Sequence, residues 1–503
     1  KLFLLKATGA FPDLSWSELL SLAGRKSSLW PTVKSGRSLE GSITSPKGSK
    51  GDLEDGKVIF RQTCSSCHGP DGEGGTAPSL SKSNLVHGDA DFTVYKILRD
   101  GIPGTGMMKQ DLSIEERWKV VSYLATLRGL RTAAAISGGF RERAIDVGFE
   151  DILQARANPS AWLTYSGGLD GWRYSSLAEL TPKNVGKLRL LWSRPFASDE
   201  GVAEAVPIVV DQTIFLVEPV NNVIAIDASS GRIIWRYVRR LPSKLSVCCG
   251  RVNRGLAILG DTLFLGTLDA HLVAINANDG KVKWDIEVAK PEEGFSITAA
   301  PLALKDSIVV GVAGGDLGIR GFVAAYNART GVEKWRFHTI PGPGEFGHDT
   351  WHGDSWKHGG GPTWITGSFD PVLNILYWGV GNPFPDYSGD MRAGDNLFTD
   401  SAIALDADTG RRIWHFQFTP HDERDWDSNQ TPILADIKIN GAVRKVVCWA
   451  NRNGFYYVLD RKSGEFLHGS AFVEQSWAEG LDRSGRPISS QQASVSTVGR
   501  VTR

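Results

Sequence analysis

The chain has 503 residues, which is too long for one ordinary domain and predicts two or three. Its 56 Lys and Arg balance 56 Asp and Glu, so no basic field favours nucleic acid or an anionic membrane as a partner. No run approaches the roughly 18–20 apolar residues that a transmembrane segment needs. No signal peptide is visible, because the apolar run at Lys1–Lys6 is too short for one.

Residues 1–50 show no sustained periodicity and end in a Ser/Gly/Lys-rich run, so we interpret them as an extension or linker. Residues 51–130 are predicted to form a small helical domain around the sequence CxxCH, which comprises Cys64, Cys67 and His68. This is the attachment signature of a c-type haem, in which both cysteines form thioethers and the histidine is an axial iron ligand. A bare CxxC also occurs in redox dithiols and zinc sites.

Two further loops favour the haem. Residues 75–80 resemble the loop that packs on a haem and supports its histidine, and residues 101–107 resemble the loop of the distal ligand. The second loop places a thioether at Met107, with Met108 as the alternative. The domain resembles a class I cytochrome c over its whole length, which implies haem c with His68 and Met107 as axial ligands.

The last helix of this domain is predicted to begin at a capping box formed by Ser113 and Glu116. Residues 131–157 are rich in Arg, Ala and Gly and are interpreted as an interdomain linker. From Asn158 onward the sequence changes to short β-branched runs punctuated by turns.

An internal repeat runs through residues 158–503. The pattern Ala-x-Asx-x-x-x-Gly-x-x-x-Trp begins at Ala225, Ala274, Ala325 and Ala404, and a degenerate copy begins at Val458. Each copy predicts a strand, a tight turn and a second strand, with a tryptophan that can dock on the neighbouring unit. Such repetition is typical of a β-propeller. The repeat resembles the tryptophan-docking motif of eight-bladed quinoprotein propellers, so the predicted fold is mainly β.

Cys248 and Cys249 are adjacent in the sequence. Neighbouring Cα atoms lie about 3.8 Å apart, less than the usual disulfide span of about 4.4–6.8 Å, so a bond between them would be strained. Such strain persists mostly at functional sites. Two reduced cysteines side by side are the alternative. The full segment, CCGRVNRG at residues 248–255, resembles the vicinal-disulfide segment of alcohol dehydrogenases that depend on pyrroloquinoline quinone (PQQ), in which the ring packs on one face of the quinone.

Four other segments resemble the active site of that family: residues 313–321, 359–364, 379–383 and 419–427. The resemblance implies a metal bound by Asp316, Asn382, Asp425 and Asp427. It implies contacts to PQQ from Glu204, Cys248, Cys249, Arg254, Thr298, Gly314, Gly315, Trp364 and Arg452. Trp364 would lie against the quinone face opposite the disulfide.

The chemistry explains these residue types. A hard cation held by carboxylate and amide oxygens polarises the quinone carbonyl, and Asp425 would take the alcohol proton as general base. The family usually has Glu where this chain has Asp316, which weakens chelation there. Asp427 is the extra carboxylate that resembles lanthanide-dependent members, so a lanthanide is favoured over Ca²⁺.

The resemblance implies a periplasmic quinohaemoprotein that oxidises a small alcohol. Electrons would pass from PQQ to the haem and then to an external acceptor such as a cytochrome or the respiratory chain. The compartment follows because c-haem attachment and disulfides both belong outside the cytoplasm. The alternative is a non-catalytic propeller that serves as a binding or assembly module beside an electron-carrying cytochrome.

Five repeats are fewer than the eight blades of the resembled fold. We therefore expect a C-terminally truncated propeller of about five blades, an open series of sheets, and poor packing after about Ile488. Cys448, which lies outside both cysteine motifs, is expected to be an inert buried thiol.

Overall fold

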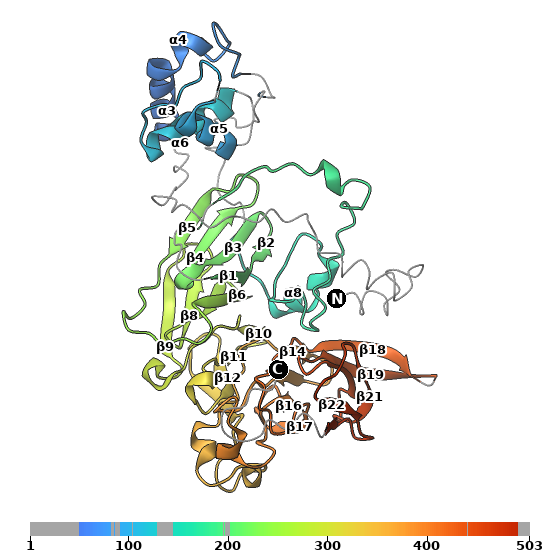
Figure 1. The fold of residues 1–503 in the computed structure, drawn as a ribbon. Helices are drawn as coiled ribbons and strands as arrows, with labels where there is room; N and C mark the ends of the chain where they lie inside the picture. Colours follow the sequence, from blue (N-terminus) through green and yellow to red (C-terminus); the bar gives the residue numbers. More distant parts are fainter. Residues whose placement is uncertain are drawn as a thin grey trace. The chain divides into compact units, whose positions relative to one another are not determined.

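The structure is a computed structural model that describes residues 50–81, 85, 91–102, 104–127, 144–194, 196, 202–439 and 441–490 (Figure 1). The predicted extension, apart from Lys50, and the first part of the predicted linker lie outside these residues. Among the described helices, none combines the length and the apolar character that crossing a membrane would require.

The helical domain comprises α3 (Lys50–Thr63), α4 (Ser65–His68), α5 (Asp91–Asp100) and α6 (Ile114–Leu127). Helices α3 and α6 cross closely, since a Cβ on Gly56 would lie 2.1 Å from the carbonyl oxygen of Lys119. Tyr95 of α5 stacks on Trp118 of α6 with ring centres 4.7 Å apart. These contacts build a small apolar core that also contains the side chain of Cys64.

The predicted capping box is present at the start of α6. The backbone N–H of Ser113 donates to the Glu116 carboxylate at 2.8 Å, and the N–H of Glu116 donates to Ser113 Oγ at 3.2 Å. Each side chain thus satisfies a backbone donor that the first turn of a helix leaves free.

The β part consists of antiparallel sheets whose strands follow chain order. The first contains β2 (Ile208–Val210), β3 (Thr213–Glu218), β4 (Asn222–Asp227) and β5 (Ile233–Tyr237). The second contains β6 (Val252–Leu259), β7 (Thr262–Gly266), β8 (His271–Asn276) and β9 (Val282–Glu287), and β1 (Val202–Val206) pairs with β6 in parallel. The third contains β10 (Leu302–Leu304), β11 (Ser307–Gly311), β12 (Phe322–Asn327) and β13 (Glu333–His338).

The fourth sheet contains β14 (Ser368–Asp370), β15 (Ile375–Gly379), β16 (Ser401–Asp406) and β17 (Arg412–Gln417). The fifth contains β18 (Ile433–Ile439), β19 (Ala442–Ala450), β20 (Phe455–Asp460) and β21 (Phe466–Ala471), and a hairpin of β22 (Ala478–Leu481) and β23 (Pro487–Ser489) follows. Short helices in this part are α8 (Phe149–Leu153), η1 (Ala155–Ala157), η2 (Val185–Lys187), η3 (Pro219–Asn221), η4 (Pro291–Glu293), η5 (Gly315–Leu317), η6 (His348–Thr350), η7 (Ser355–His358) and η8 (Gly389–Arg392).

The predicted repeats are confirmed as the last two strands of each sheet, and their tryptophans dock as expected. The indole N–H of Trp235 in the first sheet donates to the carbonyl of Ala277 in the second at 3.0 Å. Its ring covers Gly280, where a Cβ would lie 2.6 Å from the indole. Equivalent hydrogen bonds join Trp284 to Ala328, Trp335 to Ala407 and Trp414 to Arg461.

A further docking tryptophan was missed. Trp192 donates to the carbonyl of Ala228 at 2.9 Å and covers Gly231, although it follows no Ala-x-Asx turn. The described residues form five such sheets rather than the eight of the expected fold, and the last docking contact along the chain joins Trp414 of the fourth sheet to Arg461 of the fifth, so the series of blades is incomplete, as expected. Ile488 is exposed in the terminal hairpin, and the chain after residue 490 lies outside the described part.

The structure differs from the predicted linker at residues 144–157. These residues form α8 and η1, and Ile145, Val147 and Ile152 are buried in the core of the sheets. The segment after η1 forms backbone hydrogen bonds with strands of the fourth and fifth sheets. Leu169 accepts from the N–H of Phe369 in β14 at 2.7 Å, and Asp170 accepts from the N–H of Leu434 in β18 at 2.9 Å.

Candidate active site

The residues expected to attach the haem lie on one helical turn. Cys64 immediately precedes α4 and is buried, whereas Cys67 is exposed. Burial, with a smaller effect of Cys67, raises the pKa of the Cys64 thiol to about 11. His68 Nδ1 lies 2.8 Å from the carbonyl oxygen of Pro78, in the loop expected to support it. Because a carbonyl oxygen only accepts, Nδ1 is the donor in this contact and Nε2 is left free for a metal.

The two candidate distal ligands differ in burial. Met107 is half-buried and packs against the apolar core of the helical domain, whereas the side chain of Met108 is 74% exposed. A thioether that faces the core is the one that can reach a haem held by α4. The structure therefore favours Met107, and the residues of this domain fit a c-type haem.

Cys248 and Cys249 form a disulfide, which decides against the alternative of two reduced cysteines. Cys249 has a φ of 62°, a left-handed conformation that non-glycine residues rarely adopt. A carboxylate oxygen of Asp316 lies within 4.8 Å of both sulfur atoms. Since the sulfurs are bonded to each other, Asp316 is the member of this trio that offers the anionic oxygen a hard cation prefers.

Arg254 connects several of the residues expected to bind PQQ. Its guanidinium pairs with Glu204 at 3.0 Å and lies over the Trp364 ring, 4.7 Å from the ring centre. Its backbone N–H donates to the carbonyl of Thr298 at 3.0 Å. The parallel pairing of β1 with β6 brings Glu204 beside Arg254. A flat indole face next to a guanidinium suits a planar, polycarboxylated ring.

Asp427 is a buried carboxylate on which several segments converge. Its Oδ1 accepts from Trp364 Nε1, from the backbone N–H of Asn382 and from Asn429 Nδ2, each at 3.2 Å. Its Oδ2 accepts from Arg452 at 3.2 Å. Gly381 is required here, since a Cβ would lie 2.1 Å from Asp427 Oδ1. Burial raises the pKa of Asp427 to about 6, although these donors oppose the shift.

Asn382 is buried with its amide orientation fixed. Its Nδ2 donates to Asp386 Oδ1 at 2.8 Å and to the carbonyl of Pro383 at 3.2 Å. Its Oδ1 lies beside Gly315, where a Cβ would approach to 2.7 Å, and among the described residues it accepts no hydrogen bond. An amide oxygen that no described group donates to, beside Gly315 and so close in the chain to Asp316, fits the oxygen ligand of a hard cation.

Asp425 follows a sharp turn with a φ of 55° and is half-buried. Burial, followed by the charges of Asp427, Asp316 and Asp386, raises its pKa to about 7, and Arg452 opposes the shift. A carboxylate with a pKa near neutrality is suited to take a proton. The repulsion among these four carboxylates also favours a bound cation.

Asp386 was missed by sequence analysis. It lies four residues after Asn382 in a stretch without a matching motif, and only its acidic side chain near the GNP segment could have drawn attention to it. Burial and the charge of Asp316 raise its pKa to about 6.

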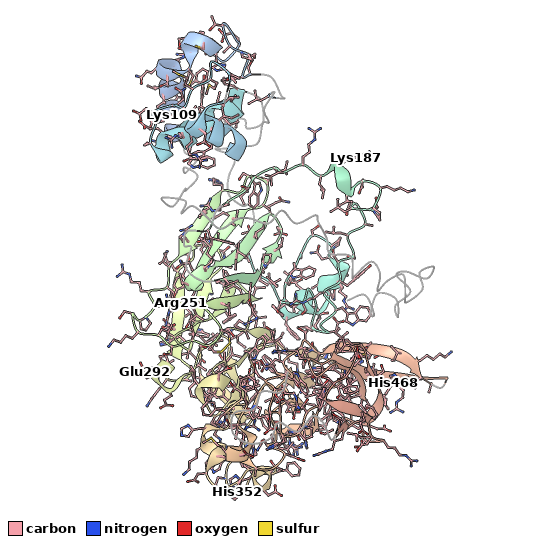
Figure 2. The ribbon with its side chains drawn as sticks, viewed as in Figure 1. Lys109, Lys187, Arg251, Glu292, His352 and His468 are labelled. Carbon is pink, nitrogen blue, oxygen red and sulfur yellow. A yellow bond between two sulfur atoms is a disulfide. The ribbon has the colours of Figure 1, made fainter. Side chains whose placement is uncertain are left out.

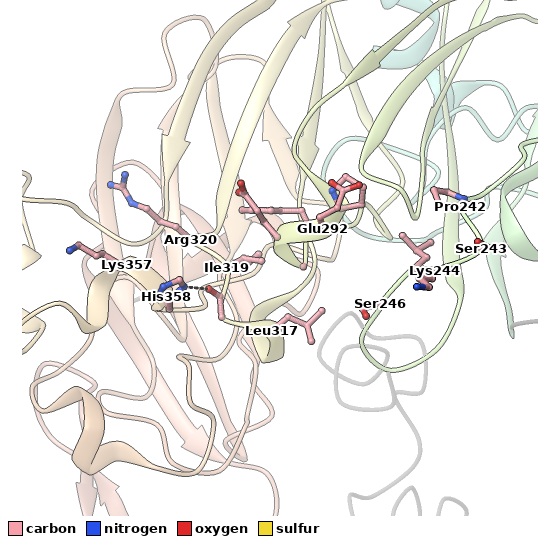
Figure 3. A pocket seen from close by; sticks show the side chains of 16 residues that line it. Pro242, Ser243, Lys244, Ser246, Glu292, Leu317, Ile319, Arg320, Lys357 and His358 are labelled. Atoms are coloured by element: carbon pink, nitrogen blue, oxygen red, sulfur yellow. Dashed lines mark hydrogen bonds between the residues drawn. The ribbon is translucent and has the colours of Figure 1, made fainter.

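Gly314 and Gly315 permit close backbone approach. Gly314 has a φ of 123°, and a Cβ there would lie 2.1 Å from the carbonyl oxygen of Gly294. A half-open cavity of about 840 Å³ lies between the segment that precedes the disulfide, Pro242–Ser246, and the residues after Asp316, Leu317–Arg320 (Figure 3). Glu292 of η4 is one of the residues that line it, and its side chain is exposed (Figures 2 and 3). None of the expected PQQ or metal residues lines this cavity.

Comparison with known proteins agrees with both parts of the chain. Residues 162–480 match the family described as glucose/ethanol/alcohol dehydrogenase, β-propeller domain, of PQQ proteins, and residues 51–124 match cytochrome c oxidase, cbb3-type, subunit III. The quinoprotein alcohol dehydrogenase PedH of Pseudomonas putida is 41% identical over 358 residues, which cover 67% of this chain and 60% of PedH.

Two solved structures are similar. The quinohemoprotein alcohol dehydrogenase ADHIIG of Pseudomonas putida HK5 has a TM-score of 0.65 and 39% identity, and the match covers 69% of this chain and 54% of that one. A europium-containing methanol dehydrogenase has a TM-score of 0.64 and 34% identity, with 68% of this chain and 63% of that one covered.

The chain spans about half to three fifths of the length of the curated relatives it matches. The two family matches identify PQQ and haem c as its cofactors. The four-stranded sheets, the docking tryptophans and the family match over residues 162–480 all indicate the same β-propeller fold. The chain therefore belongs to the family of PQQ-dependent dehydrogenase β-propellers, here preceded by a cytochrome c domain.

Proposed function

We propose that the chain oxidises a small alcohol, with PQQ as hydride acceptor and the fused haem c as the next electron carrier. The observation that supports the proposal is that Asp427 and Asp316 lie close enough to Asp425 for their charges to raise its pKa, and that the amide oxygen of Asn382 lies beside Gly315, the neighbour of Asp316. A metal held there, when bound, supplies Lewis-acid polarisation of the quinone carbonyl. Asp425 is the proposed general base, since its half-buried carboxylate lies near both Asp316 and Asp427.

The remaining site residues are proposed to hold and orient PQQ. Arg254 and Arg452 would neutralise its carboxylates, while the Cys248–Cys249 disulfide and Trp364 would cover its faces. The remaining polar and backbone contacts are proposed for Glu204, Thr298, Gly314 and Gly315. Arg254 is already held by Glu204, so its guanidinium is oriented before any ligand arrives, whereas Arg452 pairs with the Asp427 oxygen that is proposed for the metal.

For the metal we propose a lanthanide in preference to Ca²⁺. The proposed ligands are Asp316, Asn382, Asp425 and Asp427, and three carboxylates balance a trivalent ion. Asp427 Oδ1 already accepts three hydrogen bonds, so Oδ2, which now pairs with Arg452, is the oxygen that would bind the ion. The similarity to a europium-containing methanol dehydrogenase supports the choice.

We propose haem attachment at Cys64 and Cys67, axial ligation by His68 and Met107, and transfer of electrons onward to an external cytochrome or the respiratory chain. A periplasmic location follows from the disulfide and the haem attachment. For the domains we propose a cytochrome at about residues 51–130 and a propeller portion that begins near residue 144, earlier than sequence analysis placed it. The earlier start accounts for the packing of Ile145 and Val147 in the sheet core.

Reconstitution tests the function. The chain with haem c is loaded with PQQ and La³⁺, and haem reduction is followed at its α band while short alcohols are added. We expect reduction that depends on both additions and is lost in Asp425→Asn, whose haem spectrum stays unchanged. Binding of PQQ and metal without any haem reduction by alcohols would instead favour a non-catalytic propeller module.

A further inference from the structure

Asp386 occupies a place next to the proposed metal site that no motif assigns. Its Oδ1 accepts a hydrogen bond from Asn382 Nδ2 at 2.8 Å. Asn382 is only 1% exposed, so its amide is removed from water and its orientation depends on protein partners. Because both of its amide hydrogens are engaged, its Oδ1 points away from Asp386 and toward Gly315, the neighbour of Asp316.

The backbone around Asp386 is held independently of its side chain. Arg392 is fully buried and donates to the carbonyls of Pro385 at 2.9 Å, Asp386 at 3.0 Å and Asp422. It also donates to Asn396 Oδ1 at 2.8 Å. This arginine joins the 383–396 loop to the segment that carries Asp425. Truncation of the Asp386 side chain therefore leaves the loop anchored.

An asparagine amide can rotate by half a turn and exchange its oxygen and nitrogen, and only its hydrogen-bond partners decide between the two orientations. In the flipped orientation the NH₂ group would face the metal. An amide NH₂ group is a hydrogen-bond donor and offers no oxygen that a cation could bind. The ionised Asp386 carboxylate and the Pro383 carbonyl accept hydrogen bonds but donate none, so both admit only the orientation with the amide oxygen turned toward Gly315. The bond to Asp386 is the shorter of the two, at 2.8 Å against 3.2 Å.

We propose that Asp386 is a positioning residue, whose hydrogen bond to Asn382 Nδ2 keeps the Asn382 amide oxygen turned toward the metal. The inference rests on the proposed metal site and adds a residue to it. Partners that orient a metal ligand commonly contribute about 10- to 100-fold to metal affinity.

Two substitutions separate the hydrogen bond from the charge. Asp386→Asn removes the charge but keeps an oxygen that can accept from Asn382, whereas Asp386→Ala removes both. Asp390→Ala, which removes an exposed carboxylate of the same loop, is the matched control. The full chain with haem c and PQQ is titrated with Eu³⁺, and the luminescence lifetime in H₂O and D₂O gives the number of coordinated waters.

We expect Asp386→Ala to bind Eu³⁺ at least about tenfold more weakly than Asp386→Asn and to gain about one coordinated water in place of Asn382. Asp386→Asn and Asp390→Ala should keep the water number of the unmodified chain. Equal affinities and equal water numbers for the two Asp386 variants would overturn the positioning role while leaving the metal site intact. Failure of the unmodified chain to bind Eu³⁺ would overturn the metal site and the role of Asp386 together.

Discussion

The guanidinium carbon of Arg254 lies 4.7 Å from the centre of the Trp364 ring, and the same guanidinium pairs with Glu204 at 3.0 Å. A strand residue of the second sheet thus covers an indole that precedes the fourth sheet. The two residues were assigned to PQQ from separate sequence segments, and their contact shows that these segments meet at one place.

Removal of this guanidinium should weaken PQQ binding. Arg254→Ala is expected to raise the dissociation constant of PQQ about 10- to 100-fold, since hydrogen bonds to charged groups contribute about 1.5–3 kcal/mol. Quenching of tryptophan fluorescence by added PQQ measures the affinity. Arg240→Ala, at an exposed arginine after β5, is the control and should leave it unchanged. Equal affinities for the two variants would contradict a role of Arg254 in the site.

The carboxylate cluster should make the metal-free chain less stable as pH rises. Burial and mutual repulsion raise the pKa to about 7 for Asp425 and to about 6 for Asp427 and Asp386, whereas an unfolded aspartate titrates near about 3.9. Between these values the folded chain binds more protons than the unfolded one, so the free energy of unfolding falls as pH rises from about 4 to about 7. Urea midpoints measured with a chelator present should show this slope, and Asp425→Asn should reduce it.

Metal binding should release protons for the same reason. At about pH 6 the cluster is partly protonated, and a cation binds the ionised form, so affinity should increase toward about pH 7 and then level off. Calorimetric titrations with La³⁺ in buffers of different ionisation enthalpy count the protons released. A release that is the same at pH 6 and at pH 8 would contradict the raised pKa values.

The two adjacent methionines provide a matched test of haem ligation. Met107 packs on the core of the helical domain, and Met108 is 74% exposed. Met107→Ala should abolish the far-red band of methionine-ligated ferric haem and lower the reduction potential, because the thioether ligand favours ferrous iron. Met108→Ala should change neither the band nor the potential. Loss of the band in Met108→Ala but not in Met107→Ala would show that Met108 is the haem ligand instead.

Local sequence patterns predicted much of this structure because each pattern determines a strand, a turn and a second strand without help from distant residues. The Asx-to-Gly turn with its tryptophan needs only a neighbouring sheet, so the repeats were identified correctly. Trp192 has the same docking contact without the turn, and sequence therefore gave no sign of it. Ile145 and Val147 lie in a segment with an Arg/Ala/Gly-rich start, and Val147 pairs with Gly260, which lies between β6 and β7 far later in the chain.

In the site, too, residues within local motifs could be predicted, whereas residues that are recognised only by their contacts with distant segments could not. Asp316, Asn382 and Asp425 stand in recognisable motifs, whereas Asp386 is connected to the site by its hydrogen bond from the buried Asn382 amide. Apart from the nearby Asn429, the partners of Asp427 come from three separate segments, and no spacing within the sequence indicates that Trp364, Asn382 and Arg452 converge on one carboxylate. Cys448 is buried in β19, as expected of a thiol outside both motifs.

The tryptophan docking can be tested with two glycines of similar conformation. Gly280 has a φ of 76°, and an added Cβ would lie 2.6 Å from the Trp235 ring, which cannot retreat without losing its hydrogen bond to Ala277. Gly441 has a φ of 85° and nothing within 4 Å of an added Cβ. Both alanine variants carry the cost of a left-handed residue, about 1–2 kcal/mol, but Gly280→Ala adds about 1–3 kcal/mol of overpacking. Thermal unfolding followed by near-ultraviolet circular dichroism should therefore place Gly280→Ala clearly below Gly441→Ala. Equal midpoints would mean that the indole yields to the methyl group and that docking contributes little to stability.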